Sequence, residues 1–211
     1  MKTYLFDFDG TLVDSMPTFV SAMLRILDET GTPYEEDIIK IITPLGLSGT
    51  ADYFVKLGVP LSKEQLMRRM GEYMLHAYRY EIPAKPHVIE VLHQLKARGD
   101  DLNVLTASPH LTLDACLHRL GIFDLFTNVW SCDDFATTKA DPEIYKAAAR
   151  KMNRRVEDVL FLDDNLEADR TAKEAGMRVC GVYDDSSRDY VEQMRKQNDY
   201  YIFDFAELPE L

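Results

Sequence analysis

From residue 86 onward the chain alternates helix-like and strand-like stretches, and this alternation is the strongest constraint on the fold. The pattern runs through HVIEVLHQLKARG, DLNVLTAS, LTLDACLHRLG, NVWSC, DPEIYKAAARKM, VEDVLFLDDN, EADRTAKEAGM, RVCGVYD, a charged helix near 186–197 and YYIFDF. The strands are apolar on both faces, as expected when helices cover both sides of a parallel sheet. The sequence therefore predicts an α/β fold with a doubly wound parallel sheet.

A strand-like stretch also opens the chain, at residues 3–8, yet the next α/β unit begins only near residue 84. The segment between them is too long for a simple connection, and its apolar residues recur at helical spacing. We therefore expect an inserted helical domain over residues 16–81. The α/β core is then formed by residues 1–15 and 82–211.

One segment of the expected insert contains glycines and small hydroxyl residues. This segment, TPLGLSGT at residues 43–50, breaks the helical pattern, so we expect a loop there between two helices. As a loop it is the candidate contact for a substrate. A plain connection between helices is the alternative.

Charge and composition exclude several classes of partner. The 211 residues are 46% hydrophobic, enough for a proper core, and carry a net charge of −12. Nucleic acids and anionic membranes need a clustered basic face, so neither is an expected partner. No stretch approaches the roughly 18 apolar residues of a membrane span. We expect a cytoplasmic monomer or homodimer whose cysteines, which lack a CxxC pair, are reduced.

Unusual polar residues fall at the carboxyl ends of the predicted strands, where open α/β sheets bind their ligands. These residues, with a lysine that precedes a helix, are Asp7, Asp9, Thr106, Ser108, Asp163, Asp164 and Lys139. Carboxylates brought together repel one another unless a cation compensates, and an all-oxygen set suits Mg²⁺. A hydroxyl, backbone N–H groups and an ammonium would surround an anion. The constellation therefore predicts a phosphoryl-binding site.

A carboxylate beside Mg²⁺ can attack phosphorus, and a second carboxyl two residues later could donate a proton and then activate water. Residues two apart share a face only while the strand stays regular, so the chain after Asp7 decides where the second carboxyl points. Gly10 permits a tight turn after Asp9 that would aim this second carboxyl inward.

Four stretches in this order, FDFDGTLVDS, LTAS, KADPEIY and FLDDNLEADRTAKEAGM, resemble the motifs of the haloacid dehalogenase-like (HAD) hydrolase superfamily. The resemblance covers the whole chain. It is to the phosphatase branch with a helical cap, of the phosphoglycolate phosphatase and β-phosphoglucomutase kind. It implies a Rossmann-like core, a cap inserted after the first strand, and a small phosphorylated metabolite as substrate.

The resemblance also implies roles for individual residues. Asp7 would be the nucleophile and Asp9 the general acid/base, with the Asp9 backbone carbonyl also on the metal. The phosphoryl group would be held by Thr106, Ala107, Ser108 and Lys139. The Mg²⁺ would be held by Asp7, Asp9, Asp164 and Asp163, the last as a ligand or a supporting group.

Some positions depart from the usual motifs. Ala107 stands where Asn or Ser is common, Ala140 where Pro is common, and the last motif begins with Asp163 rather than Gly. The trailing acid of that motif could be Glu167 or Asp169. These departures leave the outer metal shell open.

Three other functions compete with a phosphatase. A phosphosugar mutase shares the core motifs, but Pro109 stands where such mutases commonly have a lysine. A dehalogenase lacks the second acid, which is present here as Asp9. A non-catalytic module that binds a phosphorylated ligand would not need every catalytic group.

Overall fold

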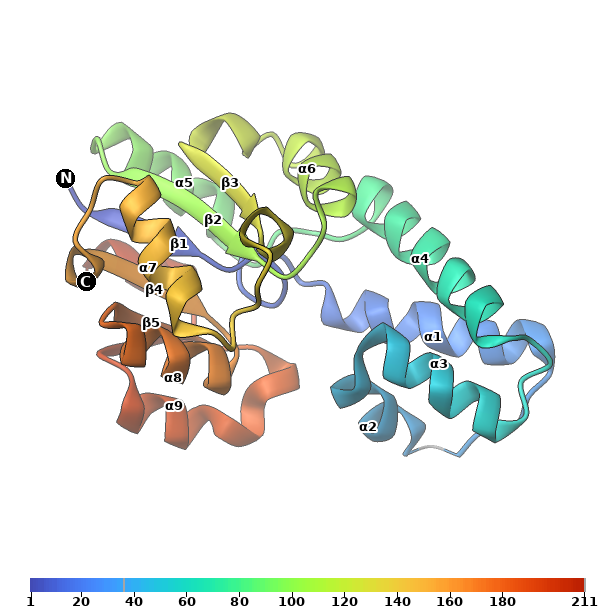
Figure 1. Cartoon of the computed structure of the whole chain (residues 1–211). Coiled ribbons are helices and arrows are strands. Elements are labelled where there is room, and N and C mark those ends of the chain that lie inside the picture. Colours follow the sequence, from blue (N-terminus) through green and yellow to red (C-terminus); the bar gives the residue numbers. More distant parts are fainter. Residues whose placement is uncertain (36, 211) are drawn as a thin grey trace. The chain divides into compact units, whose positions relative to one another are not determined.

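The computed structural model describes residues 1–35 and 37–210. The chain forms two compact units. The core unit comprises Met1–Asp14 and Pro83–Leu211, and the inserted unit comprises Ser15–Ile82 (Figure 1).

The described part of the core unit contains one parallel sheet of six strands. They are β1 (Thr3–Phe6), β2 (Asp101–Thr106), β3 (Asn128–Ser131), β4 (Val159–Asp163), β5 (Arg178–Val182) and β6 (Tyr200–Ile202). Their order in the sheet is β3-β2-β1-β4-β5-β6. This arrangement confirms the predicted doubly wound α/β class. Because the winding reverses beside β1, the carboxyl ends of β1 and β4 flank the crevice where such sheets bind ligands.

The first strand is buried on both faces, as its apolar sequence predicts. Leu5 packs in a cluster with Tyr145 and Phe161, while Phe6 on the opposite face stacks against Phe205 at 6.2 Å between ring centroids. Successive side chains of a strand point to opposite faces, so an uninterrupted apolar run is what a central strand needs.

Helices cover both faces of the sheet. They are α5 (Val88–Ala97), α6 (His110–Arg119), α7 (Pro142–Lys151), α8 (Leu166–Ala175) and α9 (Val191–Gln197). Figure 1 shows α7 and α8 on one face and α5 on the other. Two of these helices follow a residue that caps them. Asp141, just before α7, accepts from the Glu143 N–H in the first turn of that helix. Asn165, just before α8, accepts from two N–H groups in the first turn of α8.

The inserted unit is helical, with α1 (Met16–Thr30), α2 (Ile38–Ile42), α3 (Gly46–Leu57) and α4 (Lys63–Tyr80). Its interior holds apolar side chains from α1, α3 and α4, among them Met23, Phe54 and Met70. The start of α4 is fixed by a capping box, in which Ser62 accepts from the Gln65 N–H and the Gln65 side chain accepts from the Ser62 N–H.

The expected loop at residues 43–50 is wrong. Thr43–Leu45 is a short 3₁₀ helix and α3 begins at Gly46, so the segment is helical. Gly49 does not interrupt the helix. A β-carbon at this position would lie 2.9 Å from the Leu45 Cβ, so the glycine leaves room for the Leu45 side chain. Thr50 is fully buried and donates to the Ile42 carbonyl at 3.3 Å. Tertiary packing outweighs the roughly 1 kcal/mol that a helical glycine costs.

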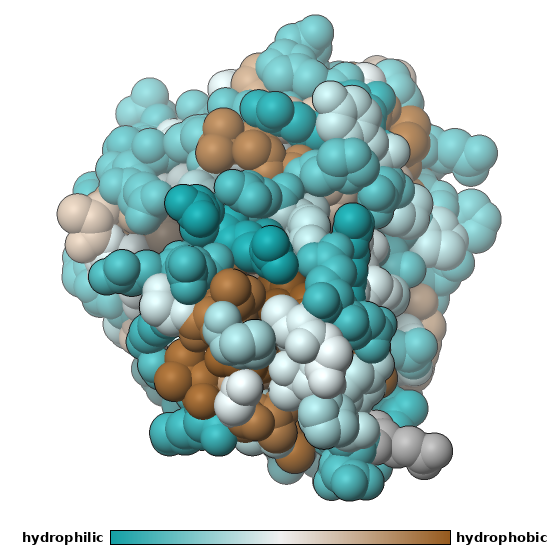
Figure 2. Space-filling model, turned by 90° about the vertical axis from the view of Figure 1, so that its right-hand side faces the viewer, coloured by the Kyte–Doolittle hydropathy of each residue, from teal (hydrophilic) through white to brown (hydrophobic). Residues whose placement is uncertain are grey.

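Figure 2 shows one face of the molecule, which is largely hydrophilic with apolar side chains gathered in a few places. The short helix α2 contributes to the exposed apolar surface through Ile39 and Ile41, while Ile38 and Ile42 are buried. Among the residues described, no helix combines the length and apolar character required to span a membrane.

Candidate active site

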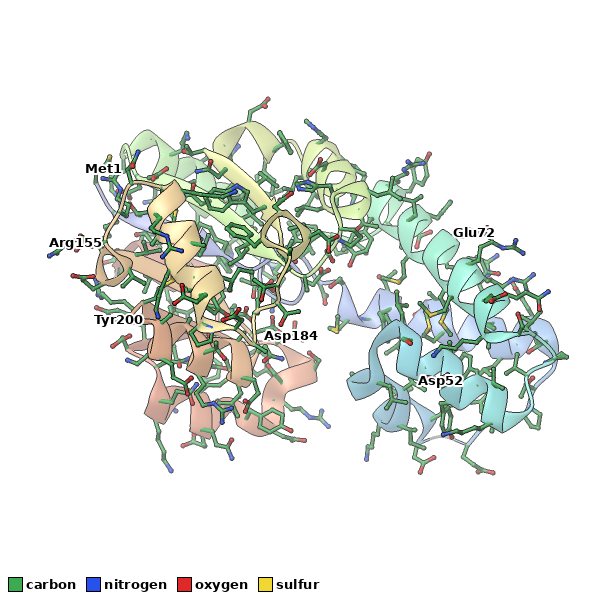
Figure 3. All side chains as sticks on the ribbon, in the orientation of Figure 1. Met1, Asp52, Glu72, Arg155, Asp184 and Tyr200 are labelled. Carbon is green, nitrogen blue, oxygen red and sulfur yellow. The ribbon has the colours of Figure 1, made fainter. Side chains whose placement is uncertain are left out.

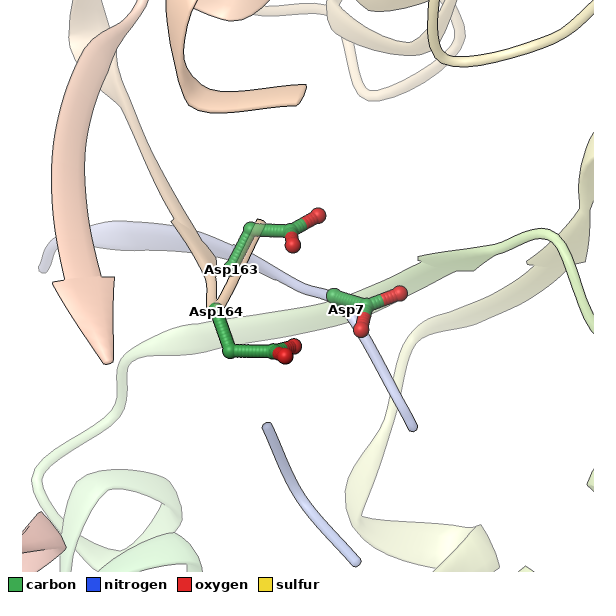
Figure 4. A group of neighbouring side chains, drawn as sticks. All are labelled: Asp7, Asp163 and Asp164. Carbon is green, nitrogen blue, oxygen red and sulfur yellow. The ribbon is translucent and has the colours of Figure 1, made fainter. Parts of the chain in front are cut away.

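Three carboxylates meet at the carboxyl edge of the sheet. Phe6 of β1 lies beside Leu162 of β4, so the next residues along, Asp7 and Asp163, also lie side by side. Oxygens of Asp7, Asp163 and Asp164 lie within 4.8 Å of one another, and Figure 4 shows the three side chains extending to the same side. All three are at most 9% exposed. Carboxylate oxygens grouped in this way could hold a hard divalent cation.

Lys139 supplies positive charge to this group from the loop before α7. Its ammonium contacts Asp7 Oδ1 and donates to Asp163 Oδ2 at 2.8 Å. The Tyr145 hydroxyl donates to the Lys139 carbonyl at 3.1 Å and so holds the loop. Burial alone would lower the pKa of Lys139, but the carboxylates of Asp163 and Asp7 raise that pKa well above its usual value. The lysine is therefore charged throughout the physiological range.

One ammonium does not neutralise three buried carboxylates. Burial raises the pKa of Asp7 to about 7 against the opposing effect of Lys139, and the neighbouring charges of Asp163 and Asp9 add to the rise. Burial also raises the pKa of Asp164 well above its usual value, together with the charges of Asp163 and Asp7. The site is therefore short of positive charge, which a bound cation would supply.

The turn that follows β1 holds Asp164. Gly10 has a φ of +77°, and a β-carbon at this position would lie 2.5 Å from the Asp164 Oδ2. Thr11 donates from its hydroxyl to Asp164 Oδ1 at 3.1 Å. Gly10 is therefore needed both for its backbone conformation and for the space that the carboxylate occupies.

The end of β2 faces Asp9. Ser108 donates from its hydroxyl to Asp9 Oδ2 at 2.5 Å, and the Ser108 N–H donates to the Thr106 hydroxyl at 3.1 Å. Thr106 is 1% exposed, whereas Ala107 is exposed. Asp9 lies outside the group of three carboxylates found among the described residues, and its side chain is instead tied to the loop after β2.

The two candidates for a trailing acid have different surroundings. Glu167 is exposed and forms an ion pair with Arg170. Asp169 is fully buried, and its Oδ2 accepts from the Asn198 side chain at 2.5 Å. Within residues 1–35 and 37–210, neither joins the carboxylates that could share a metal.

Sequence reasoning missed two charged residues close to this edge, Lys85 and Asp184. They form a buried ion pair at 3.0 Å. Lys85 lies between Pro83 and Pro86, and no periodic pattern marks a single lysine there. The one feature that could have pointed to Lys85 is its position where the chain re-enters the core after the insert.

The comparisons with known proteins show the family of this chain. The chain matches the haloacid dehalogenase-like hydrolase family over residues 4–182, and it belongs to that family. This confirms the superfamily that the four motifs predicted.

Relatives of known name cover most of the chain. A phosphorylated carbohydrates phosphatase of Thermotoga maritima is 28% identical over 86% of this chain and 85% of its own length. A phosphoglycolate phosphatase of Colwellia psychrerythraea is 29% identical over 98% and 95%. The structure of the HAD hydrolase YfnB from Bacillus subtilis, bound to magnesium, has a TM-score of 0.83 at 16% identity, covering 99% and 97%. The last likeness shows the shared fold.

Proposed function

We propose that this phosphoric monoester hydrolase uses Mg²⁺ to remove phosphate from a small metabolite of the phosphoglycolate or sugar-phosphate type. The reaction would pass through a phospho-aspartyl intermediate on Asp7. The observation that carries the proposal is the contact of the Asp7 carboxylate with Lys139 beside two further carboxylates. The names of the two phosphatase relatives support the choice of substrate class.

The residues present fit Mg²⁺. Asp7 and Asp164 would be its side-chain ligands, with the backbone carbonyl of Asp9 as a third group. Both oxygens of Asp163 already accept from protein donors, Oδ2 from Lys139 at 2.8 Å and Oδ1 from the Asn165 N–H at 2.8 Å. We therefore assign Asp163 the supporting role. When bound, the ion would lower the pKa of Asp7 and withdraw charge from the phosphoryl oxygens.

The first step transfers the phosphoryl group to the enzyme. An Asp7 oxygen attacks phosphorus, and the bond from phosphorus to the leaving oxygen breaks. Lys139 favours the ionised form of Asp7, which makes this attack, and a bound cation would favour it further. Asp9 gives its proton to the leaving oxygen, and the Ser108 hydroxyl holds the Asp9 carboxyl in place during the transfer.

The second step releases phosphate. Asp9, now ionised, takes a proton from a water molecule, whose oxygen attacks phosphorus. The bond between Asp7 and phosphorus breaks, and both aspartates return to their starting states. Thr106, the backbone N–H of Ala107 and Lys139 would bind the phosphoryl oxygens. Because the Ser108 hydroxyl is engaged by Asp9, its side chain orients the acid instead of binding phosphate directly.

The inserted unit, residues 15–82, would serve as the cap. It would exclude bulk water during transfer and select the substrate. The core motifs determine the reaction, so differences in substrate among related enzymes are expected to arise from this unit.

One assay tests the mechanism. Hydrolysis of p-nitrophenyl phosphate is measured with Mg²⁺ and with EDTA, for wild type, Asp7→Asn and the control Asp158→Asn. Asp158 is an exposed carboxylate that pairs with Arg155 at 2.8 Å. We expect Mg²⁺-dependent turnover that only Asp7→Asn abolishes. Turnover in EDTA, or an active Asp7→Asn protein, contradicts the proposal.

A second measurement separates a phosphatase from a mutase. With a hexose 1-phosphate as substrate, a phosphatase releases inorganic phosphate and a mutase yields the 6-phosphate isomer. A panel of phosphorylated metabolites, ranked by kcat/KM, then identifies the substrate class.

A further inference from the structure

The two chain segments that connect the units are hydrogen-bonded to each other within the core unit. The Asp14 N–H donates to the Pro83 carbonyl at 3.0 Å, and the Lys85 N–H donates to the Leu12 carbonyl at 3.0 Å. Val13 and Ala84 form an antiparallel bridge between these bonds. The returning segment therefore runs directly beside the turn that carries the proposed acid/base, and it brings Lys85 to that turn.

The ammonium of Lys85 is saturated by three acceptors. It donates to the Gly10 carbonyl at 2.6 Å, to the Tyr183 carbonyl at 2.5 Å and to Asp184 Oδ2 at 3.0 Å. An ammonium has three N–H donors, so each is used. The Lys85 side chain is 14% exposed and the Asp184 side chain 6%.

Asp184, labelled in Figure 3, lies just beyond the end of β5 and is itself fixed. Its Oδ1 accepts from the Ser186 N–H at 2.9 Å and from the Ser186 hydroxyl at 2.6 Å. Lys85 consequently joins the turn after β1 to the segment that follows β5, while Asp164, just after β4, lies against the same turn at Gly10.

We propose that Lys85 is a positioning residue for this site. It fixes the Gly10 carbonyl, and with it the Asp9–Gly10 turn on which the Asp164 carboxylate rests. The catalytic part of this inference rests on the proposed function. The structural part, that Lys85 immobilises the turn and aligns Asp164, does not.

A purely stabilising ion pair is the competing explanation. Removing one partner of a buried pair leaves the other charge uncompensated, so Lys85→Met alone would destabilise the protein under either explanation. Lys85→Met/Asp184→Asn removes both charges and relieves that penalty, but it does not restore a donor to the Gly10 carbonyl. The double variant therefore separates the two explanations.

The experiment compares wild type, both Lys85 variants and the control Lys173→Met. Lys173 forms a half-exposed ion pair with Asp199 at 2.9 Å, on α8 of the same unit. Three quantities are measured: hydrogen exchange of residues 8–13 without metal, the Kd for Mg²⁺ by calorimetry, and kcat and KM for p-nitrophenyl phosphate. Melting temperatures show whether each variant is folded.

We expect the double variant to melt above Lys85→Met and still to exchange faster in residues 8–13. Its Kd for Mg²⁺ should rise about 10-fold, as for other groups that orient metal ligands. Its kcat should fall roughly 100-fold with KM little changed, the scale of a 1 Å misplacement of catalytic groups. Lys173→Met should match wild type in all three measurements.

A double variant with wild-type exchange, Kd and kcat overturns the inference, and so does one that fails to recover stability over Lys85→Met. Failure of the proposed function looks different. In that case wild type itself lacks Mg²⁺-dependent turnover, and the exchange of residues 8–13 still decides the role of Lys85.

Discussion

Replacing Gly10 by alanine should separate the strain of a backbone conformation from the displacement of the Asp164 carboxylate, a proposed metal ligand. Gly10 has a φ of +77°, and the new β-carbon would lie 2.5 Å from Asp164 Oδ2. A non-glycine residue in this region costs about 1–2 kcal/mol. Ordinary contact begins at 3.4 Å, so the carboxylate must also move by about 0.9 Å.

That displacement is large for a metal site, where ligand distances hold to about ±0.2 Å. We expect Gly10→Ala to raise the Kd for Mg²⁺ at least 10-fold and to lower kcat about 100-fold. The backbone strain should lower the melting temperature by roughly 2–4 °C for each kcal/mol.

Gly121→Ala is the matched control. Gly121 has a φ of +71° and nothing within 4 Å of the added β-carbon, so only the strain applies. Calorimetric titration with Mg²⁺ and steady-state kinetics are run on both variants. The two should melt at similar temperatures and differ sharply in Kd. A Gly10→Ala protein that binds Mg²⁺ as Gly121→Ala does would refute this account of Gly10.

Three further outcomes are expected. Lys139→Met should lower kcat at least about 100-fold because it removes a preorganised donor. The control Lys146→Met, on the exposed face of α7, should leave kcat unchanged. Both values are measured by steady-state kinetics. In EDTA the melting temperature should fall as the pH rises from about 4 to 7. Folded Asp7, with its pKa near 7, retains a proton over this range, whereas in the unfolded chain an aspartate loses its proton near pH 3.9. Added Mg²⁺ should therefore stabilise more at pH 8 than at pH 5. Asp7→Asn should make the EDTA profile shallower without removing its slope, because Asp164 also has a raised pKa. Equal Mg²⁺ effects at both pH values contradict this. Ser62→Ala should cost about 1 kcal/mol by removing the α4 cap, measured by denaturant unfolding, and Ser62→Thr should retain most of it.

The core of this fold was predictable because its signals are local and repeated. Each strand after residue 86 is an apolar run, and each following helix carries its own spacing and, before α7 and α8, its own cap. The charged helix near 186–197 was predicted as one element, but it consists of the 3₁₀ helix Asp185–Tyr190 followed by α9. Segment 43–50 was wrong because packing of α3 in the insert decides its structure, and glycine propensity is a weak guide against packing.

Some residues of the candidate site could likewise be predicted from the sequence, and others could not. Asp7, Asp163 and Lys139 could be placed together in advance because parallel strands present their carboxyl ends at one edge. The hydrogen bond between Ser108 and Asp9 and the three hydrogen bonds of the Lys85 ammonium depend on side-chain directions in loops. No pattern in the sequence encodes those directions. The functions of these residues remain predictions, and the Lys85 variants above test that of Lys85.

The position of β1 has a consequence for the order in which this protein folds. Thr3 lies beside Asp101 and Val159, so the first strand to be synthesised acquires its two partners only after most of the chain has been made. The contacts that define the inserted unit, by contrast, lie within Ser15–Ile82. Because sequence-local contacts form faster than distant ones, contacts within the insert are expected to form while the apolar stretch TYLF still lacks its sheet partners. The strand that leads into the candidate site thus completes its pairing late, and until then its apolar side chains are exposed to aggregation.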